Sequence, residues 1–197
     1  RSTIMTMKQP TESERLDLWR YAYSRNSLME ARAIADLLIK SQEEIPDTER
    51  NALITSLIVA YARPFTWAQV SAKKRIIPMG DFYIPKEYKA LHENHLNMRN
   101  QVFGHKDVTR PVHMGAPLNQ VRITITGREV LIHTTVVTRY RKDKLEDTAK
   151  LLSIMIGVIE SRIDEFILKH AEAFPAKNGE YALNVEEPTK TWVFKNK

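Results

Sequence analysis

Apolar residues recur at helical spacing along most of the first hundred positions of the chain. Thr11 and Glu14 stand three residues apart, the spacing of a capping box, and predict a first helix over about 11–24. A second helix is predicted over about 26–41, because its apolar side chains repeat every three or four residues after an asparagine or serine cap. The pattern therefore predicts two short helices in succession.

A third helix is predicted over 47–63, and its apolar side chains cover nearly every side. That pattern is typical of a helix buried at the centre of a bundle. The helix should end at Arg63, because Pro64 disfavours a helical conformation in the residue before it. Residues 66–84 are predicted to be a loop, and a fourth helix follows over about 86–103.

The period of the pattern changes near residue 121, where apolar and polar residues begin to alternate. Gly127 and Arg128 suit a two-residue turn with glycine at its first central position, which predicts one β-hairpin over about 121–138. A last long helix is predicted over 144–173 from its continuous apolar stripe. The remainder, about 175–197, is predicted to be an irregular tail.

The predicted fold class is mainly α, with 1–197 as a single domain. It is an up-and-down bundle of four to five helices with the β-hairpin inserted before the last long helix. An isolated hairpin is only marginally stable in water. Val121, Ile123 and Ile125 are therefore expected to pack on the bundle or on a partner subunit.

Composition narrows the function only slightly. Thirty Lys and Arg against 24 Asp and Glu give a net charge of +6, which permits a nucleic-acid partner without demanding one. The absence of cysteine excludes disulfides, zinc–thiolate sites and cysteine nucleophiles. The apolar runs 52–62 and 151–159 are shorter than the roughly 18 residues of a membrane span. With no secretion signal recognised, a cytoplasmic protein without a membrane partner is expected.

The main candidate for chemistry lies where the fourth helix should end. Arg99 and Asn100 are on its last turns, Gly104 can cap it, and His105 follows the glycine. A histidine can accept and give protons near neutral pH. The planar guanidinium group of an arginine matches phosphate oxygens. These residue types favour a site for a phosphate-bearing substrate, with Asn100 orienting the histidine or the phosphate.

Spacing alone carries little information, because Arg128 and His133 match it too. The run 99–107, with asparagine after the arginine and histidine downstream, resembles the motif of the HEPN superfamily. Its members are helical bundles, and many are metal-independent endoribonucleases of toxin–antitoxin and phage-defence systems. The resemblance implies that His105 is the acid and base and that Arg99 stabilises the phosphate transition state. It also implies an RNA substrate, no metal or other cofactor, and a homodimer with two motifs in one cleft. An antitoxin or a nucleotidyltransferase is the protein partner to expect.

Other basic residues are candidate contacts for RNA phosphates, although charged runs are commonly solvated surface. Arg63 can alternatively be tied to helix carbonyls and a nearby carboxylate. The candidate RNA contacts are Arg63, Lys73, Lys74, Arg75 and Lys106.

His92 and His95 share one face of the predicted fourth helix with Arg99. Two histidines three residues apart can bind a metal, but the run is one residue short of the His-Glu-x-x-His motif. We therefore expect polar face residues, or residues buried at a dimer contact, that can also line the cleft. Two alternatives to a ribonuclease stay open. One is a non-catalytic bundle that binds a nucleotide, a nucleic acid or a protein, and the other is a structural dimer in which the motif is coincidental.

Overall fold

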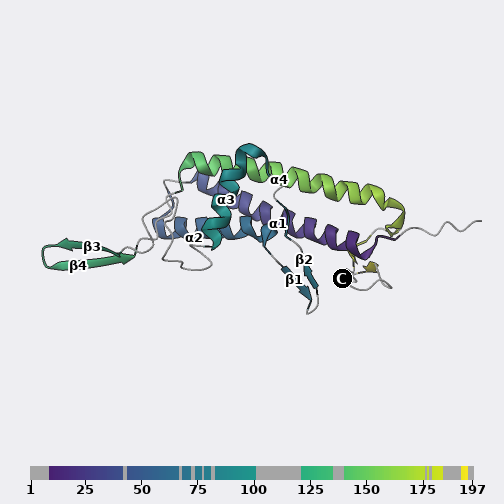
Figure 1. Ribbon diagram of the computed structural model, residues 1–197, viewed down its shortest axis with the longest axis horizontal. Coiled ribbons are helices and arrows are strands. Elements are labelled where there is room, and N and C mark those ends of the chain that lie inside the picture. Colours follow the sequence, from purple (N-terminus) through teal and green to yellow (C-terminus); the bar gives the residue numbers. More distant parts are fainter. Residues whose placement is uncertain are drawn as a thin grey trace, which may run out of the picture.

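The fold is mainly α, as predicted, and the part of the chain that the structure describes has four α-helices accompanied by short strands (Figure 1). The helices are α1 (Glu12–Lys40), α2 (Asp47–Ala62), α3 (Lys89–Met98) and α4 (Lys142–Lys169). The computed structural model describes residues 9–41, 44–66, 68–71, 74–76, 78–80, 83–100, 121–134, 140–175, 177, 179–183 and 192–194. Within those ranges, no helix combines the length and hydrophobicity needed to cross a membrane.

The N-terminal segment is one continuous helix, α1, so the prediction of two successive helices is wrong. The predicted capping box is confirmed: the Glu14 amide donates to the Thr11 hydroxyl, and the Thr11 amide donates to the Glu14 carboxylate. Ser24 and Ser27, near the expected break, are buried in the bundle. A serine inside a helix costs at most about 0.7 kcal/mol relative to alanine, less than burial of the apolar stripe that continues past it.

α1 and α4 pack antiparallel along their length (Figure 1). Lys169 near the end of α4 lies 2.7 Å from Glu14 near the start of α1, which fixes the direction of the pair. Each helix places a stripe of fully buried side chains in the shared core: Leu28, Ala31, Ala35 and Leu38 from α1, and Leu145, Leu151, Leu152, Met155 and Ile159 from α4. α4 starts two residues before the predicted helix and ends at Lys169, and a 3₁₀ turn takes the chain on to Ala173.

α2 follows α1 and precedes α3 in the chain, and it packs against both. It ends at Ala62, one residue before the predicted end, and a 3₁₀ turn over Arg63–Phe65 follows it with Pro64 buried. The 3₁₀ turn Lys86–Tyr88 then precedes α3. α3 is therefore shorter at its start than predicted. A π-helical turn at 99–100 follows α3, and residues 101–103, the end of the predicted fourth helix, lie outside the described residues.

The predicted hairpin before the last helix is confirmed. β3 (Val121–Thr126) pairs antiparallel with β4 (Glu129–Thr134), and Gly127 takes the left-handed conformation (φ +61°) that the first central position requires. Figure 1 shows the two strands extending away from the helices. Ile123 and Ile125 are 59% and 70% exposed. The prediction that these two side chains pack on the bundle is therefore wrong. Packing on a partner subunit stays a prediction.

Two further hairpins were not predicted. β1 (Ala68–Ser71) pairs with β2 (Lys74–Ile76) inside the predicted loop, with an irregular register. β5 (Tyr181–Leu183) pairs with β6 (Trp192–Phe194) inside the predicted irregular tail. Strands of three or four residues are too short to give a readable alternation of apolar and polar positions. The predictions of a loop and of an irregular tail are therefore wrong where the structure describes these strands.

Candidate functional site

Arg99 lies on the π-helical turn that ends α3, with its backbone fixed by the preceding turn. Its amide N–H donates to the carbonyls of His95 and Leu96. Its guanidinium Nη1 donates to the Asn100 side-chain carbonyl at 2.9 Å. Arg99 is half-buried and Asn100 is exposed. The neighbouring amide thus orients the guanidinium group of Arg99 while leaving its charge in place. Single π-helical turns occur frequently at functional sites.

The electrostatic setting of Arg99 differs from that of most arginines in the helices. Within the described residues, no carboxylate lies within salt-bridge distance of the Arg99 guanidinium, so no described acidic group neutralises its charge. Six other arginines each pair with an aspartate or glutamate: Arg20, Arg32, Arg50, Arg63, Arg141 and Arg162.

The other predicted site residues are only partly placed. His105, Lys106 and Lys73 lie outside the described residues, while Lys74 and Arg75 belong to strand β2. In the sequence, His105 follows Arg99 by six positions.

Arg63 lies on the 3₁₀ turn after α2 and forms an ion pair with Glu30 of α1. Two environments were predicted for Arg63. One was bonding to helix carbonyls and a nearby carboxylate, and the other was exposure in a cleft. The structure shows the tie to the carboxylate, with both side chains partly exposed.

His92 and His95 are buried among the helices, at 5% and 0% exposure. The Tyr61 hydroxyl of α2 lies 2.8 Å from Nδ1 of His92, and the Tyr61 ring stacks on His95 with ring centroids 4.5 Å apart. The Tyr140 hydroxyl, just before α4, lies 2.5 Å from Nε2 of His95. The two histidines therefore join α3 to α2 and α4, and their rings are enclosed by these neighbours.

The protonation state of His95 follows from its partners. Nδ1 lies 2.6 Å from the Leu91 carbonyl oxygen, which can only accept, so Nδ1 carries the proton and Nε2 accepts from Tyr140. The Thr148 hydroxyl, 3.2 Å from Nε2, donates to the Lys144 carbonyl. Burial lowers the pKa of His95 to about 4 and raises the pKa of Tyr140, so both are neutral at pH 7.

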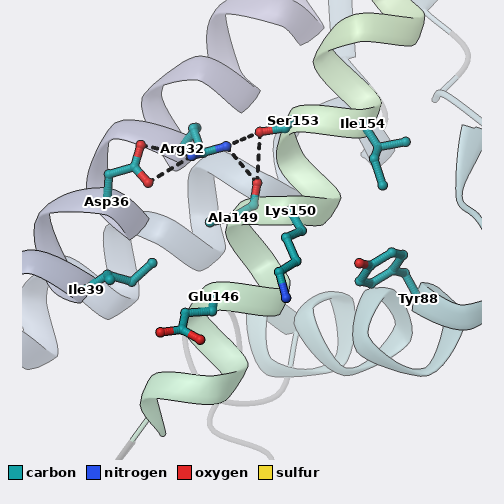
Figure 2. Close-up of a pocket in the computed structure, with 9 residues that line it drawn as sticks. All are labelled: Arg32, Asp36, Ile39, Tyr88, Glu146, Ala149, Lys150, Ser153 and Ile154. Atoms are coloured by element: carbon teal, nitrogen blue, oxygen red, sulfur yellow. Dashed lines mark hydrogen bonds and ion pairs between the residues drawn. The ribbon is translucent and has the colours of Figure 1, made fainter.

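A groove of about 590 Å³ lies between α1 and α4 beside Tyr88 (Figure 2). Its most prominent cation is Arg32, whose Nε donates to both oxygens of Asp36 at 2.9 Å. The Arg32 Nη1 donates to the Ala149 carbonyl at 3.0 Å and to the Ser153 hydroxyl. Figure 2 shows these bonds crossing from one helix to the other. Arg32 therefore joins α1 to α4 through its Nη1 donor.

Sequence reasoning missed the groups that hold the two histidines, Tyr61, Tyr140 and Thr148. Tyr140 lies 45 residues from His95, and no periodicity links the two positions. The helical spacing of His92 and His95 was the available signal, because it placed both rings on one face.

The described residues contain no group of three or more His, Asp or Glu side chains arranged to hold a metal ion. Comparison of the chain with protein-family models, with curated proteins and with solved structures gives no match.

Proposed function

We propose that the chain is a metal-independent endoribonuclease of the HEPN kind, with Arg99 and His105 as its catalytic residues. The observation that carries the proposal is the setting of Arg99. Its guanidinium group lies at the end of a helix, is oriented by an amide, and meets no described carboxylate. A half-buried cation of this kind suits a phosphate group, because a planar guanidinium binds two phosphate oxygens at once.

The proposed reaction uses the 2′-hydroxyl of the RNA as its nucleophile. His105 accepts the proton of that hydroxyl while its oxygen attacks the adjacent phosphorus atom. Arg99 stabilises the negative charge that develops on the phosphate oxygens. The 5′-oxygen of the next nucleotide leaves and takes up a proton, either from His105 or from its equivalent in a second copy. The products are a 2′,3′-cyclic phosphate and a 5′-hydroxyl.

The biological setting belongs to the same proposal. A twofold axis would double the Arg99 and His105 pair in one cleft without additional sequence, so a cytoplasmic homodimer is proposed. Its role would be that of a toxin or phage-defence nuclease controlled by an antitoxin or a nucleotidyltransferase. Light scattering at micromolar concentration should give the mass of a dimer. A monomer would contradict the shared cleft.

The test of the chemistry is cleavage of a single-stranded RNA in excess EDTA. Wild-type protein should cleave and leave 2′,3′-cyclic phosphate ends, and His105→Ala should cleave about 10²-fold more slowly or worse. The matched control is His133→Ala on β4, which removes a histidine at the same spacing from Arg128 and should keep full activity. Loss of cleavage in EDTA, or full activity of His105→Ala, would contradict the proposal.

A further inference from the structure

His95, on the ten-residue helix α3, is held by contacts from three directions. Its Nδ1 donates to the Leu91 carbonyl, its Nε2 accepts from Tyr140, and its ring stacks on Tyr61. The side chain is completely buried. A buried ring with both nitrogens engaged and one face covered has a single orientation available, so the backbone at His95 is fixed with it.

The same residue fixes the backbone of Arg99. The carbonyls of His95 and Leu96 both accept from the amide N–H of Arg99, and the bond to His95 spans one turn of the helix. A rotation of the helix at His95 would therefore carry the Arg99 turn with it. Displacements of about 1 Å in a positioning group can cost about 10²-fold in rate.

The bond between His95 and Tyr140 also closes a long stretch of chain. The two residues are 45 positions apart, and their side chains meet at 2.5 Å. The sequence between them includes both Arg99 and His105. The Tyr140 hydroxyl thus ties the residue two positions before α4 to the helix that ends next to Arg99.

We propose that Tyr140 and His95 are positioning residues for the reaction. The hydrogen bond between their side chains fixes His95, and His95 in turn fixes the helical turn at Arg99. This inference rests on the proposed ribonuclease function. Neither side chain touches the substrate, because both are buried. Loss of the bond should therefore lower the rate of the chemical step while leaving RNA binding nearly unchanged.

The test compares Tyr140→Phe with Tyr61→Phe. Each variant keeps its ring and removes one buried hydroxyl from a histidine of α3, so both should lower the melting temperature by similar amounts. Tyr140→Phe should lower kcat at least tenfold with KM within about twofold. Tyr61→Phe should stay within about twofold of wild type in kcat, because its hydroxyl contacts His92, whose carbonyl does not accept from Arg99.

Amide hydrogen exchange gives a second readout that does not depend on cleavage. The Arg99 amide should exchange at least tenfold faster in Tyr140→Phe than in Tyr61→Phe. Equal kcat and equal exchange in the two variants would overturn the inference while leaving the ribonuclease intact. An unfolded Tyr140→Phe beside a folded Tyr61→Phe would also overturn it, since the hydroxyl would then support the whole bundle. Wild-type protein without RNA cleavage would overturn the proposed function and the inference together.

Discussion

The α1–α4 pair and the short helix α3 are held in place by different physical means. α1 and α4 have 29 and 28 residues and share a long stripe of buried aliphatic side chains. α3 has ten residues and anchors two buried histidines to hydroxyl groups on its neighbours. Apolar burial is non-directional and distributed over many groups, whereas a hydrogen bond fixes one geometry. The orientation of α3 therefore depends on a few directional bonds, and α3 ends next to Arg99.

Arg32 in the α1–α4 pair and Arg99 after α3 differ in their hydrogen-bond partners. Arg32 donates from Nε to Asp36 and from Nη1 to the Ala149 carbonyl and Ser153, and the Nη1 bonds join α1 to α4. Arg99 is oriented by Asn100 and keeps its charge. Arg32 therefore joins two helices, whereas Arg99 meets no carboxylate among the residues that the structure describes.

The largest expected effect comes from breaking the apolar pair. Leu152→Ala removes a fully buried side chain of α4 and should lower the free energy of unfolding by about 2–5 kcal/mol. Urea denaturation measures it, with Leu168→Ala as the control. Leu168 is 78% exposed, so its loss should cost less than about 0.5 kcal/mol. Similar losses in both variants would contradict the assignment of the core.

Acid should weaken the α3 network next. His95 is neutral in the fold with a pKa of about 4, while the unfolded chain takes up a proton below about pH 6.5. Stability is therefore complete above pH 6.5 and falls as the pH drops toward 4, by about 3 kcal/mol in all. Melting temperatures measured across this range should fall less steeply in His95→Gln. An equally steep fall in that variant would assign the effect to another group.

The cluster that joins the ends of α1 and α4 should respond to acid at lower pH. Hydrogen bonds from Lys169 and Thr11 lower the pKa of Glu14 to about 2, from 4.5. Its stabilisation is present above pH 4.5 and is lost as the pH falls toward 2. Glu14→Gln should flatten the stability profile below pH 4.5 and leave the fall between pH 6.5 and 4 intact. A change confined to the upper range would contradict this separation.

The smallest loss of unfolding free energy is expected from removing the Arg32 hydrogen bonds between α1 and α4. Arg32→Ala should cost about 1 kcal/mol, because the Asp36 and Ser153 side chains are exposed and can bond to water. Arg162→Ala removes an exposed pair within α4 and should cost less. Chemical denaturation of the two variants gives the comparison, and a loss from Arg32→Ala as large as that from Leu152→Ala would reverse the ranking.

Features set by neighbouring residues could be predicted from the sequence. The capping box at Thr11, the end of α2 before Pro64 and the turn at Gly127 depend on local chemistry, and all three are found. The continuity of α1 depends on packing against α4, which no local pattern reports.

The candidate site also has features that the local sequence predicts and features that only the folded chain shows. The sequence placed Arg99 near the end of a helix, but it could not show that this arginine lacks a described carboxylate partner. Some arginines have an acid three or four residues away, whereas Arg63 finds Glu30 at a distance of 33 residues. The contact of Tyr140 with His95 is equally remote in sequence, and only the folded chain brings the two together.

The most direct test of the central claim is RNA cleavage by Arg99→Ala measured beside Arg128→Ala. Arg128 lies at the exposed hairpin turn and matches the same Arg–His spacing, so it controls for the loss of one positive charge. Arg99→Ala should lose about 10²–10³-fold in kcat, the scale of losing one charge-stabilising donor, while its unfolding free energy changes by less than about 0.5 kcal/mol. Arg128→Ala should cleave at the wild-type rate. Wild-type cleavage by Arg99→Ala, or equal losses in both variants, would contradict the assignment of Arg99 to the reaction.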